Sequence, residues 1–292
     1  MTLFFQTLVN GVLVGGLYVT ISIGFSLAFG VLDVVDFAVG EWVMLGAFAG
    51  VASQSWANVD PFAALPVVFV VFAAAGALIA PLIHRVRRSR YARPALMALA
   101  FTFGLATLAR GTMLTAVGFD PRTVRTGFAT GTLSVVGLEV PWLRLAGFIF
   151  AMVATSLFMA FLYMTRTGLA VRATAQSQEN AALMGVDVKR ISTLVYAIYA
   201  GMTGMAGVLI GSIYAITAQD GPQYALLAFF VVVLAGLGSV AGVLVAGVIL
   251  GVVQAMVTIY IGPSYTLAVV FGVLFLTLLI SPRGILGRGA AV

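Results

Sequence analysis

Ionisable side chains inside apolar stretches are the first candidates for chemistry in this sequence. Asp33, Asp36 and Glu41 cluster between two apolar runs, and Arg110 lies within another. A charge facing lipid at mid-depth costs at least about 2.5–3.5 kcal/mol, so such residues are functional candidates. The acidic cluster predicts either a polar turn or a helix break that lines an internal cavity. For Arg110, an inward ion pair or snorkelling to the outer interface is favoured over contact with a solute.

No arrangement of residues indicates catalysis. His84 is the single histidine, cysteine is absent, and no GxxxxGK[ST] loop is present to hold nucleotide phosphates. His84 is interpreted as a structural residue at the membrane interface, because no second histidine or nucleophile accompanies it. We therefore expect a chain that is not an enzyme and binds no cofactor of its own. If transport is driven by ATP, ATP and Mg²⁺ must be bound by partner subunits.

The composition of the 292 residues predicts a membrane protein. Hydrophobic residues make up 62% and charged residues 8%, against roughly 45–50% and about 25% in ordinary globular domains. A soluble domain of this length cannot hide so much apolar surface, which argues against soluble enzymes and nucleic-acid-binding modules. We expect an all-α, polytopic membrane bundle that forms one transmembrane domain over residues 1–292.

The apolar runs predict eight or nine spanning or broken helices, at 8–32, 37–54, 62–83, 94–118, 142–165, 191–217, 223–261 and 265–280. The run 223–261 is too long for one span at about 1.5 Å per residue, and Gly236-Leu237-Gly238-Ser239 interrupts it. Asp220 and Tyr224 flank the Gly221-Pro222 pair that opens this run. The weaker run 37–54 is either spanning or re-entrant.

Basic residues predict the orientation in the membrane. Segments 85–93, 166–190 and 283–288 hold eleven of the fifteen Lys and Arg residues. The positive-inside rule places loops 85–93 and 166–190 and the C-terminus in the cytoplasm, and loop 119–140 in the periplasm. The N-terminus is then outside if 37–54 spans and inside if it is re-entrant. The net charge of +6 thus reflects topology, and no nucleic-acid partner is expected.

Segment 166–190 has the composition of a short cytoplasmic helix that docks on a partner. Ala-rich helix formers span Leu169–Met184, and Gly185 supplies a stop. Leu183 and Val186 offer apolar anchors beside a small-residue face, which suits insertion into a groove. A helix resting on the membrane surface would carry more large apolar residues at helical spacing.

Glycines at small-residue spacing predict close helix packing, because packing between helices replaces the hydrophobic effect inside lipid. The residues expected to serve this purpose are Gly11, Gly15, Gly46, Gly207, Gly211, Gly238, Gly242 and Gly247.

Segment 166–190 resembles the corresponding segment of a known protein family. Glu179, Ala181 and Gly185 match the EAA-type coupling segment of bacterial ATP-binding-cassette (ABC) importer permeases, with Asn180 in place of an alanine. The pattern Gly168-x-Ala170-x-Arg172-Ala173 with Ala181-x-x-x-Gly185-Val186 is similar to the branched-chain amino acid permease family. Further similar motifs are Asn10-Gly11, Gly15-Gly16-Leu17-Tyr18, Phe37-Ala38-x-Gly40-Glu41 and Gly236-Leu237-Gly238-Ser239-x-x-Gly242.

The resemblance implies a permease subunit of an ABC importer in the bacterial inner membrane. It implies a second homologous permease, two cytoplasmic ATPase subunits and a periplasmic solute-binding protein as partners. The residues expected to couple to the ATPase are Gly168, Arg172, Ala173, Glu179, Ala181, Ala182, Leu183, Gly185 and Val186. The residues expected along the translocation pathway are Asn10, Tyr18, Asp36, Gly40, Glu41 and Arg110.

The sequence departs from the family beside the expected pathway. Residues 36–41 read Asp-Phe-Ala-Val-Gly-Glu, where the family usually has Asn-Phe-Ala-His-Gly-Glu. The substrate is therefore left open among branched-chain or hydrophobic amino acids and related small solutes such as urea and amides. The acidic cluster and Arg110 also fit an alternative class, a self-sufficient secondary transporter or channel.

Overall fold

The computed structural model describes residues 2–87, 94–124, 126, 131–135, 138–282 and 284–285. Most of the Arg-rich segment 85–93, parts of loop 119–140, and Arg283 with 286–292 lie outside these described residues. The N-terminal half contains helices α1 (Thr2–Leu32), α2 (Val39–Ala57), α3 (Pro61–Arg87), α4 (Pro94–Val117) and α5 (Trp142–Met164), with strands β1 (Thr132–Val135) and β2 (Leu138–Pro141). The C-terminal half contains α6 (Arg166–Gln176), α7 (Gln178–Leu183), α8 (Val188–Ile213), α9 (Gly221–Ala235), α10 (Val240–Tyr260), η1 (Pro263–Tyr265) and α11 (Thr266–Ile280).

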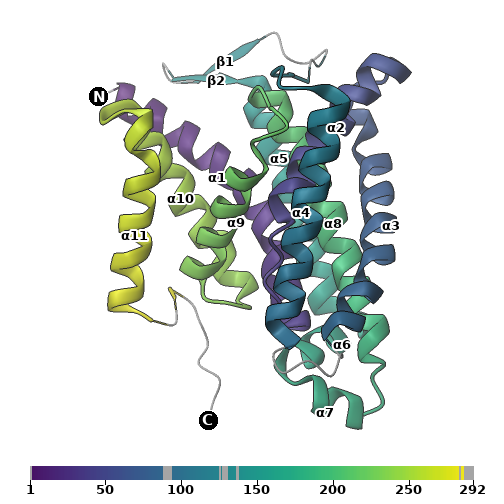
Figure 1. Cartoon of the computed structure of the whole chain (residues 1–292). Coiled ribbons are helices and arrows are strands. Elements are labelled where there is room, and N and C mark those ends of the chain that lie inside the picture. Colours follow the sequence, from purple (N-terminus) through teal and green to yellow (C-terminus); the bar gives the residue numbers. More distant parts are fainter. Residues whose placement is uncertain are drawn as a thin grey trace.

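The predicted all-α membrane bundle is confirmed. Among the described residues, seven helical segments are long and apolar enough to cross a membrane: α1, α3, α4, α5, α8, α10, and η1 with α11. The shorter α9 and the more polar α2 complete the core of the bundle, where they pack with α1, α8 and α10 (Figure 1). The structure adds one feature that the sequence reading lacked, the antiparallel hairpin of β1 and β2.

Helix α1 joins the two ends of the bundle. Near its start, Gln6 exchanges hydrogen bonds with the backbone of Glu139 in β2. Near its end, the Gln178 amide of α7 donates to the carbonyl of Val31 over 2.6 Å. Helix α2 then returns to the hairpin end, where Gly50 lies against Val124 (Figure 1). The re-entrant alternative for residues 37–54 is therefore wrong, and the N-terminus lies at the end opposite α7.

The expected interruption of residues 223–261 is present. Helix α9 ends at Ala235, and Gly236 and Gly238 adopt left-handed φ values of 95° and 81°. The Ser239 hydroxyl then caps α10 by accepting a hydrogen bond from the Gly242 amide over 3.1 Å. A side chain at either glycine would strain the turn, which explains why the two segments separate here.

The expected single helix over Leu169–Met184 is instead two helices. Ser177 is extended between α6 and α7, and its hydroxyl accepts the Asn180 amide as the N-cap of α7. Serine favours such caps over helix interiors, because its side chain competes for backbone hydrogen bonds. The predicted stop at Gly185 lies at a φ of 84°.

Most of the packing glycines lie at tight helix contacts. A Cβ atom on Gly11 would lie 2.6 Å from Val252, and one on Gly15 would lie 2.8 Å from Gly247. Between α2 and α8, a Cβ on Gly46 would lie 2.1 Å from the carbonyl of Gly204. Similar crowding surrounds Gly207, Gly211, Gly242 and Gly247. Gly238 differs: it lies in the turn after α9, where backbone conformation and not helix packing calls for glycine.

Substituting Gly207 with alanine should destabilise the contact between α2 and α8. The added Cβ would lie 2.1 Å from the carbonyl oxygen of Val43, and overpacking of this kind costs about 1–3 kcal/mol. Gly104→Ala is the matched control, because its Cβ would meet nothing within 4 Å. We expect a lower thermal midpoint in detergent for Gly207→Ala and an equal or higher one for Gly104→Ala. Equal losses in both variants would contradict the packing assignment.

Candidate functional site

The first turns of two helices meet inside the bundle. A Cβ atom on Gly40, at the start of α2, would lie 1.8 Å from the carbonyl oxygen of Gly221. A Cβ on Gly221, at the start of α9, would lie 2.3 Å from a carboxylate oxygen of Glu41. Only glycines permit this approach, so two helix N-termini and one carboxylate share a small buried volume. We call this contact the α2–α9 junction.

A buried carboxylate fixes the chain where α1 breaks before α2. Asp36 accepts hydrogen bonds from the hydroxyls of Tyr196 and Tyr199 over 2.7 and 3.1 Å, and from the Ala38 amide over 2.8 Å. These donors satisfy an acidic group that is almost wholly removed from solvent. Asp36 therefore anchors the non-helical residues 33–38 to α8 and sets the level at which α2 begins.

A similar device starts α9. The Asp220 carboxylate accepts the Thr217 amide over 2.7 Å and closes the turn that leads into the helix. Pro222 follows in the first turn of α9, where its missing N–H costs no helical hydrogen bond. Helices α2 and α9 thus both begin inside the bundle, and each is preceded by a carboxylate that organises its first turn: Asp36 for α2 and Asp220 for α9.

Glu41 pairs with Arg110 at the junction. The Arg110 Nε and Nη2 atoms donate to Oε1 of Glu41 over 3.0 and 2.8 Å. The Glu41 side chain is 3% exposed and that of Arg110 is 33% exposed. Of the two alternatives favoured for Arg110, the inward ion pair is therefore the one present, and it ties the peripheral α4 to α2. The partial positive charge of the two helix N-termini favours the carboxylate as well.

The second oxygen of Glu41 has no hydrogen-bond partner within the part of the chain that the structure describes. This Oε2 atom lies against Gly221, as does the paired Oε1. A buried carboxylate oxygen without a donor is costly, so such an atom is suited to receive a donor from a ligand.

Polar side chains also gather on the α1 and α10 side of α9. Tyr18 is buried, and the side chains of Gln254, Tyr214 and Tyr224 lie within electrostatic reach of its hydroxyl. Tyr224 belongs to the same first turn of α9 as Gly221. The first turn of α9 therefore contacts Glu41 and also lies close to a group of neutral hydroxyl and amide side chains.

Four of the six residues expected along the pathway surround this turn: Tyr18, Gly40, Glu41 and Arg110. Asp36 lies apart, among the tyrosines of α8. Asn10 is on α1, and its buried Oδ1 has no partner among the described residues. The residues of the site that were not predicted from the sequence are Tyr196, Tyr199, Tyr214 and Gln254. Gln254 could have been found as an amide inside an otherwise apolar run.

The residues expected to couple to an ATPase divide into a base and a tip. In the base, a Cβ on Gly168 would lie 2.3 Å from the carbonyl oxygen of Phe161, and Arg172 stacks 4.7 Å over the Tyr163 ring. Ala173 is half-buried and Ala181 is buried. These contacts hold α6 against the end of α5.

The tip of this segment is open. The exposed residues expected to take part are Glu179, Ala182, Leu183 and Gly185, while Val186 is half-buried. Leu183 and its neighbour Met184 are each 85% exposed, although both are large and apolar. Adjacent exposed apolar side chains on a capped helix end are typical of a docking surface. We call Leu183 and Met184 the α7 tip.

Metal binding has no support within the described residues, where no group of three or more His, Cys, Asp or Glu side chains is placed to hold an ion. The site consists of the α2–α9 junction inside a membrane bundle and the exposed apolar α7 tip at one end. This arrangement is that of a polytopic membrane transport protein.

The chain belongs to the family of branched-chain amino acid transport system permease components, whose model matches residues 7–278. It is 29% identical over 298 residues to the high-affinity branched-chain amino acid transport system permease protein LivH of Escherichia coli, covering 98% of this chain and 96% of that protein. It is 27% identical to the permease protein BraD of Pseudomonas aeruginosa, with the same coverage.

A probable branched-chain amino acid transport permease protein LivH of Methanocaldococcus jannaschii is 25% identical, over 95% of this chain and 91% of that protein. No solved structure matches the chain. The relatives are permease subunits and not enzymes, which confirms the expected class of protein.

Replacing Arg110 with Met should destabilise the protein, because the Glu41 carboxylate would stay buried without its cation. Breaking a buried pair in this way costs about 3 kcal/mol or more, whereas removing both charges is often nearly neutral. We therefore expect the double variant Glu41→Gln/Arg110→Met to regain most of the loss. Thermal midpoints of the purified variants in detergent measure this. A double variant no more stable than Arg110→Met would argue against a buried pair.

Proposed function

We propose that this chain is a transmembrane permease subunit of an ABC importer. It carries branched-chain or other hydrophobic amino acids, or a related small solute, across the bacterial inner membrane. The observation that carries the proposal is the exposed α7 tip in a chain that matches this permease family over nearly its whole length. The sequence has no phosphate-binding loop of its own, so ATP and Mg²⁺ would be bound by two separate ATPase subunits.

In this proposal the α7 tip receives the motion of an ATPase. Leu183 and Met184 insert into a groove on the ATPase, while Gly168 and Arg172 hold the base of the segment against α5. The Gln178 contact with the last turn of α1 carries a displacement of α7 into the bundle.

The α6–α7 end of the bundle faces the cytoplasm in this proposal. The cations Arg85, Arg87, Lys189 and Arg190 lie at this end, in agreement with the positive-inside rule. The β1–β2 hairpin and the N-terminus then face the periplasm, where loop 119–140 helps to dock a solute-binding protein. Helix α11 returns the chain to the α7 end (Figure 1), so the C-terminus would be cytoplasmic.

The solute route passes the first turn of α9. An amino acid carries an ammonium group and a carboxylate, and the side chains around this turn offer matching partners. The free oxygen of Glu41 can accept a hydrogen bond from the ammonium group. The hydroxyls of Tyr18 and Tyr224 and the amide of Gln254 can donate to the carboxylate. Separation of α9 from α2 at Gly40 would open the route.

A second, homologous permease completes the pathway. Helices α4 and α11 expose most of their apolar surface in the single chain, which is suited to lipid or to a neighbouring permease. A secondary transporter or channel is the alternative, since Glu41 and Arg110 lie inside the bundle. Uptake driven by an ion gradient, by this chain alone in liposomes, would favour that alternative and overturn the importer assignment.

Replacing Met184 with Ser should weaken assembly with the ATPase subunits, because it removes half of the apolar α7 tip. Met164→Ser is the matched control, since Met164 is 84% exposed at the end of α5, outside the docking segment. We expect a loss of about tenfold in ATPase affinity and in ATP-dependent uptake for Met184→Ser or Leu183→Ser, in line with a lost interface anchor. Equal effects of Met184→Ser and Met164→Ser would remove the tip from the docking surface.

The solute route predicts a different set of effects. Tyr18→Phe and Tyr224→Phe each delete one buried hydroxyl, and each should lower the uptake rate about three- to tenfold at limiting solute, as expected for one lost hydrogen bond. Assembly with the ATPase should be unchanged. Tyr260→Phe, at the exposed end of α10, is the control. Normal uptake in a Tyr18→Phe/Tyr224→Phe double variant would place the route elsewhere.

A further inference from the structure

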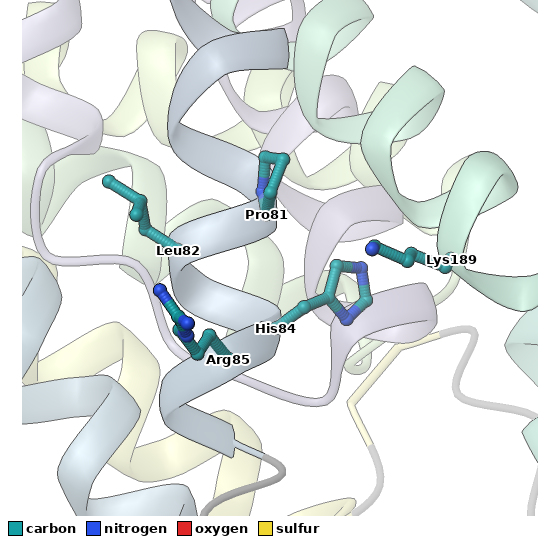
Figure 2. Close-up of a pocket in the computed structure, with 5 residues that line it drawn as sticks. All are labelled: Pro81, Leu82, His84, Arg85 and Lys189. Atoms are coloured by element: carbon teal, nitrogen blue, oxygen red, sulfur yellow. The ribbon is translucent and has the colours of Figure 1, made fainter.

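A cavity lies where α3 and α8 end at the α7 side of the bundle. Its volume is about 560 Å³, and it is lined by Pro81, Leu82, His84, Arg85 and Lys189. Figure 2 shows Lys189 extending from α8 toward the imidazole of His84 on α3. The volume is within the range of roughly 300–1,000 Å³ that is typical of small-ligand sites.

Two cationic side chains line the cavity, and their ion pairing differs from that of their neighbours in the sequence. Within the described residues, Arg85 and Lys189 are both exposed and neither takes part in an ion pair. Their sequence neighbours behave differently: Arg87 pairs with Asp33 over 3.0 Å, and Arg190 pairs with Asp187 over 2.9 Å. The cavity therefore concentrates positive charge without an acidic partner, which is suited to an anion.

The wall of the cavity changes from cationic to apolar along α3. Leu82 lies one turn before Arg85 and is 47% exposed, and Leu78, one turn further back, is 76% exposed. Side chains at these spacings share one face of a helix. A ligand bound here therefore meets charge at the end of a membrane helix and an apolar strip along its side.

We propose that this cavity binds the headgroup phosphate of an anionic phospholipid, with the acyl chains along Leu82 and Leu78. Arg85 and Lys189 contact the phosphate, as basic residues at the membrane surface do for anionic lipids. Free inorganic phosphate shares the charge but has nothing to place against Leu78 and Leu82. The proposal does not depend on which solute the protein carries or on the ATPase partner.

The position of the cavity gives the lipid a structural effect. Lys189 lies in the first turn of α8, six residues after Leu183 of the α7 tip. Arg85 lies in the last turn of α3, which packs along α8 with Gly76 against the backbone of Tyr196. A lipid that contacts both cations links α3 to the helix that follows α7, and so restrains the chain on the C-terminal side of the α7 tip.

The test measures lipid retention by the full-length chain. Wild type and variants are reconstituted in nanodiscs of phosphatidylglycerol and phosphatidylcholine in equal amounts, and retained lipids are counted by native mass spectrometry. We expect the wild type to retain phosphatidylglycerol in preference to phosphatidylcholine. Arg85→Gln and Lys189→Gln should each weaken retention about fivefold, the effect of one basic residue at a membrane surface.

Arg190→Gln is the matched control, because it removes a neighbouring cation that pairs with Asp187 outside the cavity. It should retain phosphatidylglycerol like the wild type, and Lys189→Arg should do so as well, which separates charge from misfolding. Equal losses in Lys189→Gln and Arg190→Gln would overturn the proposal. So would equal retention of the two lipids, or displacement of phosphatidylglycerol by millimolar inorganic phosphate, which would indicate a free-phosphate site.

Discussion

A carboxylate held between two helix N-termini and an arginine is the interaction around which this bundle is organised. Inside a membrane, interrupted helices are tolerated only where protein groups satisfy the freed backbone and compensate the charges. Glu41 lies against Gly221 and bonds Arg110, so α2, α9 and α4 all meet at one acidic group. The positions of Asp36 and Asp220 follow from the same requirement, because each organises the turn before an interrupted helix.

Much of this arrangement could be predicted from the sequence. Long apolar runs predict the spanning helices, since a membrane helix is the usual structure for so many consecutive apolar side chains. Gly236 and Gly238 mark the break after α9. Acidic residues at 33–41 indicate a second break, because charge inside a membrane is costly. The resemblance to the permease family also anticipated the family that the family model shows.

Other features depend on contacts between distant residues and could not be predicted. Nothing local in the sequence pairs Glu41 with Arg110, or Asp36 with Tyr196 and Tyr199, more than 60 residues away. The junction of Gly40 with Gly221 likewise depends on where two separate helices begin. The break at Ser177 was missed for a different reason: an alanine-rich helical pattern outweighed a single capping residue.

The contact between Gln178 and Val31 has a mechanical consequence. It fastens the start of α7 to the last turn of α1, and Glu41 lies only ten residues further along the chain from Val31. Residues 33–38 between them are not helical, and the Asp36 carboxylate fixes them to Tyr196 and Tyr199 of α8. A displacement of α7 is thus passed toward α2 through a short connection that is anchored at Asp36. Because this connection ends at the start of α2, the next contact that such a displacement reaches is the one between Gly40 and Gly221 of α9.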